Sequence, residues 1–554
     1  MQYIIISFTA LIGTVFITPY IIELLNKIKI IDFPDGGRKV HTSPIPRMGG
    51  VIIFTVVNAL LFIFFGDINS IRFFIFGAVI IIALGAYDDF FSAGWYLKFI
   101  YQIVSAACLL IYLVPKFSAL RFFGIEFSVI PAVILLLFFI VGTINSFNLL
   151  DGLDGLASGI SLLVSTLLFF ISLNHINIFL LVLLSSLIGC LTGFLKYNAY
   201  PARIFLGDSG SFILGYLTVS SVLIVSINNS NGVLDLTFPV ILLAVPIADT
   251  LKVLTERLLT GRHPFLADRK HIHHIVFSKN ITHKRTVFII TLYSLLFAAN
   301  AIYYHFYSEL YGIIIFLLLT IPLIFANKLL NFIINREKLL IYTRAINRFP
   351  QYLINFFKIA VIPIVAVFVL LSFIFLLAVG KNLSAEFLVP SFIIIAVLFI
   401  FTLINYRKNK IFTDIIVFFN ILLFFIINQT NSMLYKDFLN LPLLGNLNFH
   451  LLLIAVLFPV VGFFLFFRDR IQLNREMLLT GLDLVIILLI VLLSISSNLI
   501  PIAKSYIITD TIFRSYLIYI FYKVLIQVQP KFRLSLHTFS FLVVIASQTL
   551  LLIS

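Results

Sequence analysis

Long apolar runs recur along this chain from its first residues to its last, and short polar segments rich in turn residues separate them. Most runs are about 17 to 25 residues long, which is the length that a helix needs to cross a bilayer. Strands of a membrane barrel would alternate apolar and polar positions, and these runs do not. Because a helix satisfies its own backbone hydrogen bonds in lipid, the pattern predicts an all-α fold, a polytopic bundle of transmembrane helices.

The spacing of the runs predicts two regions. Residues 1–327 are expected to form one membrane-embedded domain of about eleven helices. These helices are expected at roughly 4–20, 49–65, 73–87, 97–115, 128–147, 157–172, 177–194, 211–227, 237–252, 286–305 and 310–326. A basic stretch that begins at Lys328 breaks the apolar pattern. About seven further helices, of unknown role, follow it within residues 328–554.

Composition agrees with a membrane location. The chain is 61% hydrophobic and 11% charged, with a mean hydropathy of +1.14, whereas a soluble domain is about a quarter charged. The first apolar run has no basic residue before it and no small-residue cleavage site, so we expect a retained helix and not a signal peptide. Cys108 and Cys190 both lie inside apolar runs, which gives no indication of a disulfide or a zinc site.

The net charge of +15 has a topological explanation. The basic residues are spread over many short loops and form no single stripe, which argues against nucleic acid as a partner. Lys and Arg are concentrated in alternate loops, and such loops face the cytoplasm in membrane proteins. This bias predicts that the N-terminus lies outside and that the loops after the first, third, fifth, seventh and ninth helices lie inside.

Acidic and amide side chains gather at the inner ends of two predicted helices. The segment GAYDDF places Asp88 and Asp89 where the third helix leaves the membrane, although a solvated helix end also explains this pair. The segment NSFNLLDGLDGLASG carries four polar residues at three-residue spacing: Asn145, Asn148, Asp151 and Asp154. On a helix these side chains would share one face, while the glycines between them favour a turn that approaches a ligand closely.

Two further acids lie at predicted cytoplasmic ends. Asp208, in FLGDSGSF, precedes the eighth helix, where an Asp–Ser pair suits a helix cap and where free amides suit a phosphate. Asp249, in PIADT, lies near the inner end of the ninth helix. An acid there is costly unless it is functional or paired, and Lys252 is the partner expected from the sequence.

The longest polar loop, GRHPFLADRKHIHH, combines cations with a histidine cluster. Histidine suggests zinc, but the loop has neither the HExxH nor the CxxC order of a zinc site. Cations and imidazoles instead suit a diphosphate, through charge-assisted hydrogen bonds. The candidate ligands in this loop are Arg262, Asp268, His271, His273 and His274.

These five motifs share one predicted membrane face, and together they indicate phosphoryl transfer. Carboxylates are ligands for a hard cation such as Mg²⁺, which binds through one or two of them and through substrate phosphates. Basic groups offset the charge that develops during transfer. The chain has no Walker A sequence, so NTP-driven transport is not supported.

In their order along the chain, these motifs resemble the polyprenyl-phosphate N-acetylhexosamine-1-phosphate transferase family, glycosyltransferase family 4, which includes the WecA, TagO and MraY enzymes. The resemblance adds the N-terminal segment DGGRKVHTSPIPRMGG with Lys39, and Lys98 with Gln102, and it covers roughly residues 1–326. It implies that Asp88 and Asp89 are catalytic and that Asp208 and Asp89 bind the metal. The substrate-binding residues that it implies are Lys39, Lys98, Asn148, Asp151, Asp154, Arg262, Asp268, His271, His273 and His274.

The resemblance also implies a reaction and a location. A polyprenyl phosphate attacks a UDP-N-acetylhexosamine and UMP leaves, with Mg²⁺ as the cofactor and Mn²⁺ as a substitute. The expected site is the cytoplasmic face of a bacterial inner membrane, and a homodimer is compatible with the family. The HIHH form resembles the branch that uses UDP-GlcNAc, with UDP-muramyl-pentapeptide or a 6-deoxy amino sugar as alternatives.

A lipid-linked sugar transporter is the alternative from another class. It would place its functional charges near the middle of the membrane. In this sequence the acids crowd at helix ends and in loops, which favours an enzyme.

Overall fold

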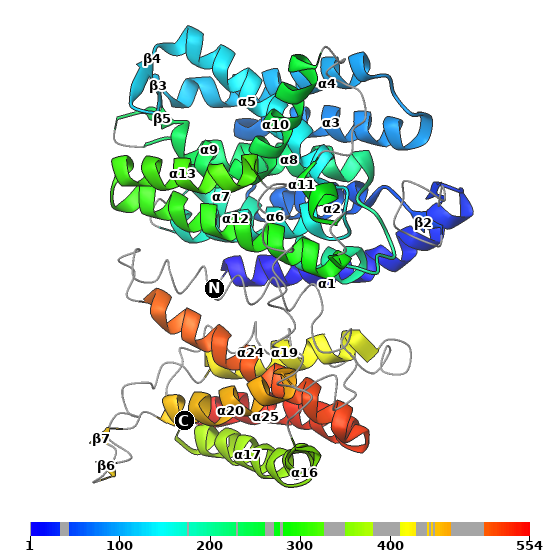
Figure 1. Ribbon diagram of the computed structural model, residues 1–554, viewed down its shortest axis with the longest axis vertical. Helices are drawn as coiled ribbons and strands as arrows, with labels where there is room; N and C mark the ends of the chain where they lie inside the picture. The colour runs from blue at the N-terminus through cyan, green and yellow to red at the C-terminus, as the bar shows by residue number, and fades with distance from the viewer. Residues whose placement is uncertain are drawn as a thin grey trace. The chain divides into compact units, whose positions relative to one another are not determined.

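The computed structural model describes twelve stretches of the chain. They are residues 2–33, 44–173, 177–228, 231–260, 271–277, 281–325, 350–379, 410–427, 440–441, 445–446, 449–466 and 504–553. These residues fall into two compact units, one that ends at Phe325 and one that begins at Pro350 (Figure 1). The predicted boundary at 327/328 lies outside the described residues.

Helices at all eleven positions predicted for the first region are present in the first unit. Its helices are α1 (Gln2–Lys27), α2 (Gly49–Phe64), α3 (Arg72–Phe91), α4 (Trp95–Leu113), α5 (Val129–Leu150), α6 (Leu156–Ser172), α7 (Ile178–Asn198), α8 (Gly207–Val225), α9 (Thr237–Leu242), α10 (Ala244–Leu259), α11 (Ile272–Phe277), α12 (His283–Phe306) and α13 (Glu309–Ile324). Nine helices among the described residues of the whole chain are long and apolar enough to cross a membrane. The prediction of an all-α, multi-pass membrane protein is confirmed.

The predicted ninth helix is broken into two. Leu243, between α9 and α10, leaves the helical conformation at φ −98° and ψ 21°. Pro246 explains the position of the break, because it has no N–H to donate to the carbonyl of Leu242 and its ring crowds that carbonyl. The short helix α11, which contains His273 and His274 and directly follows His271, was not predicted.

A small sheet that was not predicted joins two of the connections. Strand β3 (Ala119–Phe122) pairs antiparallel with β4 (Ile125–Phe127) and parallel with β5 (Val233–Asp235). Phe123 and Gly124 both have positive φ, as the tight turn of this hairpin requires. A second, two-stranded pairing, of β1 (Ile31–Asp32) with β2 (Ile45–Pro46), precedes α2.

Helix α8 is the central helix of the first unit. It packs against α2, α3, α5 and α6, and it is almost entirely buried (Figure 1). Tyr216 donates from its hydroxyl to the carbonyl of Phe74 at 2.8 Å, and the hydroxyls of Thr218 and Ser161 are hydrogen bonded at 2.8 Å. Small and hydroxyl residues suit such a helix, because they allow close approach and bond across helix interfaces in lipid.

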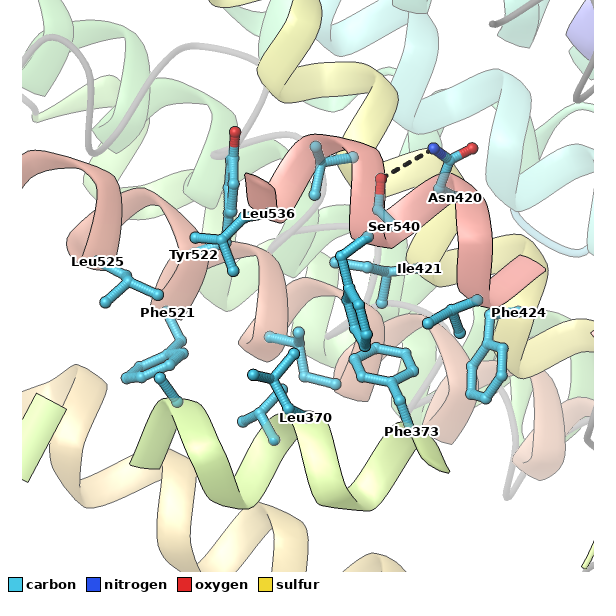
Figure 2. Close-up of a pocket in the computed structure, with 16 residues that line it drawn as sticks. Leu370, Phe373, Asn420, Ile421, Phe424, Phe521, Tyr522, Leu525, Leu536 and Ser540 are labelled. Carbon is cyan, nitrogen blue, oxygen red and sulfur yellow. Dashed lines mark hydrogen bonds between the residues drawn. The ribbon is translucent and has the colours of Figure 1, made fainter. Parts of the chain in front are cut away.

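The described part of the second unit consists mainly of helices. They are α16 (Gln351–Phe356), continued by η3 (Phe357–Val361) and α17 (Ile362–Val379), then α19 (Lys410–Ile427), α20 (Phe449–Phe466), α24 (Lys504–Val528), η7 (Pro530–Phe532) and α25 (Arg533–Ile553). Helices α17, α19, α24 and α25 enclose an apolar cavity of about 60 Å³ (Figure 2). Asn420 donates to the hydroxyl of Ser540 at 3.0 Å at the edge of this cavity. Two very short strands, β6 (Asn440–Leu441) and β7 (Gly445–Asn446), pair with each other.

Candidate active site

The N-terminus of α8 is capped from another helix. Leu206, at the capping position, has no side-chain acceptor for the free amides of the first turn. Asp89, at the end of α3, supplies both acceptors: Oδ1 lies 3.0 Å from the amide of Asp208 and Oδ2 lies 3.1 Å from the amide of Ser209. A buried carboxylate is also favoured there by the helix dipole. The sequence left open whether Asp208 caps this helix, and the structure assigns that role to Asp89.

Two glycines let the backbones around this cap approach each other. A Cβ on Gly50, in α2, would lie 2.3 Å from the amide nitrogen of Gly210. A Cβ on Gly85, in α3, would lie 2.4 Å from the Cα of Ser209. Arg47 fastens the same region, because its Nη2 donates to the carbonyl of Asp89 at 2.6 Å. The first turn of α8 is therefore held between the start of α2 and the end of α3.

We expect Gly85→Ala to displace the first turn of α8, because the methyl group meets backbone and not a flexible side chain. Overpacking of this kind costs about 1–3 kcal/mol. The measurement is thermal unfolding of the purified protein in detergent. Gly142→Ala on α5 is the matched control, since nothing lies within 4 Å of a Cβ there. Equal melting temperatures for the two variants would contradict the close approach.

Asp88 and Asp208 share one lysine. Asp88 is buried, accepts from the amide of Ala93 at 2.6 Å and forms an ion pair with Lys98 in the first turn of α4. The Lys98 ammonium also lies 3.7 Å from Oδ2 of Asp208. The side chains of Lys98 and Asp208 are each 28% exposed, so this group is open to a ligand. The three predicted residues therefore converge on one site.

Amides of α5 complete one side of this site. Asn148 donates from Nδ2 to Oδ1 of Asp208 and to the hydroxyl of Ser211, the latter at 2.9 Å. Asn145, one turn earlier, instead exchanges hydrogen bonds with Gln102 of α4, at 2.6 and 3.2 Å. Asn148 therefore orients the Asp208 carboxylate, while Asn145 and Gln102 join two helices.

The second half of this motif is a turn and not a helix. Helix α5 ends at Leu150, and Gly155 takes a left-handed conformation, φ +77°, before α6 begins. Burial raises the pKa of Asp151 well above its ordinary value, and the negative charges of Asp208, Asp154 and Asp89 raise it further. Asp154 accepts from the amide of Ala202 at 3.1 Å. The sequence allowed either a helix or a turn for this motif. Asn145 and Asn148 lie on the helix α5, and Asp151 and Asp154 lie in the turn that follows it.

The histidine cluster packs on this turn. A Cβ on Gly152 would lie 2.3 Å from Nε2 of His273, so a larger residue would have to displace that ring. The rings of His271 and His273 are nearly parallel, with centroids 5.9 Å apart, and His274 lies 4.2 Å from His273. The pKa of His273 is lowered to about 3, mainly by burial and in addition by the neighbouring His274 and His271. His273 is therefore a neutral imidazole at physiological pH.

Two residues near these motifs had no predicted role in the site, although Asp249 belongs to one of the five motifs. Asp249 pairs with His271 and not with Lys252, at 3.0 Å between Oδ2 and Nδ1. Its signal in the sequence was an acid within an apolar run. The ring of His283 stacks on Tyr200 at 4.4 Å and interacts with Asp154. No pattern in the sequence singled out His283.

Comparison with known proteins decides the family. A probable undecaprenyl-phosphate N-acetylglucosaminyl 1-phosphate transferase of Bacillus subtilis is 33% identical over 313 residues, which are 54% of this chain and 85% of the relative. The profile of glycosyl transferase family 4 matches residues 71–226. The chain belongs to glycosyl transferase family 4. The matched residues include Asp88, Asp89, Lys98, the NxxNxxDGxDG motif and Asp208.

Two further relatives of this family 4 protein carry related names. An undecaprenyl-phosphate alpha-N-acetylglucosaminyl 1-phosphate transferase of Thermotoga maritima is 34% identical over 286 residues, 51% of this chain and 84% of the relative. The enzyme of the same name from Escherichia coli K12 is 26% identical over 306 residues, 53% of this chain and 83% of the relative. Each match leaves nearly half of this chain uncovered.

The acidic site of the family 4 protein suits a divalent cation. Asp88 and Asp208 lie beside the same lysine, and the pKa of Asp151 is raised first by burial and then by the negative charges of Asp208, Asp154 and Asp89. A divalent cation would relieve this repulsion, and oxygen ligands are the ones that Mg²⁺ prefers. No group of three or more His, Cys, Asp or Glu side chains in the described part of the chain is arranged to hold a metal by itself. Mg²⁺ commonly needs only one or two carboxylates when substrate phosphates supply the rest.

Three predicted site residues lie outside the described part of the structure: Lys39, Arg262 and Asp268. Their roles stay predictions. The catalytic, metal-binding and substrate-binding roles of the other predicted residues also stay predictions. Both oxygens of Asp89 accept amide hydrogen bonds.

Proposed function

We propose that this protein transfers N-acetylglucosamine 1-phosphate from UDP-GlcNAc to a polyprenyl phosphate and releases UMP. The observation that carries the proposal is the convergence of Asp88, Asp208 and Lys98 at the capped end of α8. The names of the family 4 relatives support the choice of sugar and lipid. The histidine cluster on the neighbouring turn supplies the imidazoles that a nucleotide diphosphate needs.

The reaction replaces the phosphoanhydride bond between the sugar phosphate and UMP with a phosphoanhydride bond between the sugar phosphate and the lipid phosphate. An oxygen of the lipid phosphate forms a bond to the sugar-linked phosphorus, and the bond from that phosphorus to the bridging oxygen of UMP breaks. The electron pair of that bond leaves with UMP. Two anions must meet in this step, so the Lys98 ammonium lowers their repulsion.

The proposed cofactor is Mg²⁺, with Asp208 as its ligand and Asp88 beside it. When bound, the ion would neutralise the diphosphate and polarise the reacting phosphorus. Asn148 keeps the Asp208 carboxylate in place for this role. Asp88, paired with Lys98, faces the same ligand space and is the candidate for contact with the lipid phosphate.

The proposed location is the cytoplasmic side of a bacterial inner membrane, with the N-terminus outside. The distribution of Lys and Arg over alternate loops supports this orientation. In this position the reaction would be the first lipid-linked step of a cell-envelope polysaccharide.

The test of the proposal is release of radioactive UMP from UDP-GlcNAc that carries ³²P in the phosphate next to uridine. We expect release by the purified protein to require both polyprenyl phosphate and Mg²⁺. A panel of UDP-sugars, with mass spectrometry of the lipid product, then identifies the sugar. Absence of any lipid-dependent UMP release with the whole panel would refute the proposal.

The second unit is expected to be dispensable for the chemical step. Every described residue of the proposed site lies in the first unit. A chain that ends near Lys338 should therefore insert into membranes and keep transfer within about tenfold of the full-length protein. The measurement is the same UMP assay, normalised to protein that is monodisperse in detergent. A monodisperse but inactive shortened chain would mean that the second unit completes the site.

A further inference from the structure

Asp249 is a buried acid near the site to which the proposed reaction assigns no role. It lies in α10 with 5% of its surface exposed, and His271 is 4% exposed. Both of its carboxylate oxygens are occupied. Oδ1 accepts from the amide of Ile272 at 2.7 Å, and Oδ2 lies 3.0 Å from Nδ1 of His271. The carboxylate therefore holds both the backbone at the start of α11 and the ring of His271.

This pairing fixes which nitrogen of His271 carries a proton. A carboxylate only accepts hydrogen bonds, so Nδ1 must be the protonated nitrogen. Nε2 is left as the nitrogen that meets a ligand. It is buried and has no hydrogen-bond partner among the described residues. An unpaired buried nitrogen costs free energy, which a ligand that bonds to it would recover.

The neighbouring ring differs in this respect. His273 lies parallel to His271 and packs on Gly152, but the structure gives its ring no carboxylate partner among the described residues. One imidazole of the pair is thus anchored by an acid, and the other is held by packing. Acids that orient a histidine in this way are common behind metal-binding imidazoles, where their loss typically costs about 10- to 100-fold in metal affinity or activity.

We propose that Asp249 is a positioning residue, which holds His271 so that Nε2 meets the diphosphate of the nucleotide sugar, and which affects transfer only through that ring. This inference rests on the proposed function. When a phosphate oxygen lies at Nε2, a doubly protonated ring donates to the carboxylate on one side and to the phosphate on the other. Without the carboxylate, the ring loses its fixed orientation and this second donor.

A double-mutant cycle tests the proposal. Asp249→Asn should lower UDP-GlcNAc transfer about 10- to 100-fold, and His271→Ala at least as much. The double variant Asp249→Asn/His271→Ala should be no less active than His271→Ala alone, because Asp249 has nothing left to position. Asp249→Glu, which keeps the carboxylate, should recover part of the activity. Multiplicative losses in the double variant would overturn the proposal.

Two controls separate this outcome from others. Asp235→Asn makes the same change at an acid that pairs with Arg121 and Tyr304, and it should leave transfer near normal. All variants are compared at equal amounts of monodisperse protein, with melting temperatures recorded. If the unaltered protein transfers no sugar phosphate, the proposed function fails. If it is active but Asp249→Asn is equally active, only the positioning role fails.

Discussion

Asp208→Asn is expected to abolish transfer, while the protein still folds and inserts. The amide keeps the size of the side chain but removes the charge that a magnesium ligand supplies. It also removes the negative charge that lies 3.7 Å from the Lys98 ammonium. One of the two carboxylate oxygens becomes an NH₂ group, so only one oxygen is left to accept the hydrogen bond from Asn148. The measurement is UMP release from UDP-GlcNAc at saturating Mg²⁺ and polyprenyl phosphate.

The control for Asp208→Asn is Asp235→Asn, which changes a partly buried, paired acid in the same unit. Both variants should elute as monodisperse protein, and only Asp208→Asn should be inactive. Raising Mg²⁺ should not restore activity, because the ligand itself has changed. Near-normal turnover of Asp208→Asn would remove Asp208 from the metal site.

Asp88→Asn and Asp89→Asn should both lose most activity, but for different physical reasons. Asp89 accepts two backbone hydrogen bonds at the start of α8, and asparagine has only one acceptor oxygen. Its replacement should therefore destabilise the fold by about 1–3 kcal/mol. Asp88 has one carboxylate oxygen on the amide of Ala93, and the other faces Lys98 beside the proposed ligand space. Its replacement should affect chemistry more than stability.

Thermal unfolding distinguishes the two aspartates. The melting temperature should fall clearly for Asp89→Asn and little for Asp88→Asn, and both should be measured beside UMP release. A stable, inactive Asp89→Asn variant would instead favour a direct metal or catalytic role for Asp89. Equal destabilisation by both changes would mean that the pair acts as one structural unit.

The placement of the helices could be predicted from the sequence because lipid leaves few alternatives. A run of about 20 apolar residues must satisfy its backbone internally, so length and polarity alone locate most helices. The break at Leu243 was missed, because a proline inside an apolar run is tolerated in membrane helices and need not end one. The sheet of β3, β4 and β5 was missed because its strands are short and because β5 pairs with β3 from far along the sequence.

The site could be predicted only as a set of residues. An acid or histidine near an apolar run is costly enough to indicate function, which was sufficient to select Asp88, Asp208 and the histidine loop. Equivalent neighbours in the sequence nevertheless have different roles. Asp88 pairs with Lys98 while Asp89 caps α8, and this difference follows from adjacent helical residues pointing about 100° apart.

The sequence by itself determined the fold class, the family resemblance and the residue types at the site. Only the tertiary structure decided which hydrogen-bond or ion-pair partner each carboxylate oxygen has. Asp249 shows the reason: its expected partner Lys252 is three residues away, whereas its actual partner His271 lies beyond a long loop. Hydrogen-bond pairing depends on distances of about 3 Å between side chains. Helices α10 and α11 both pack against α12, and this arrangement brings Asp249 and His271 together. Spacing along the chain carries no information about it.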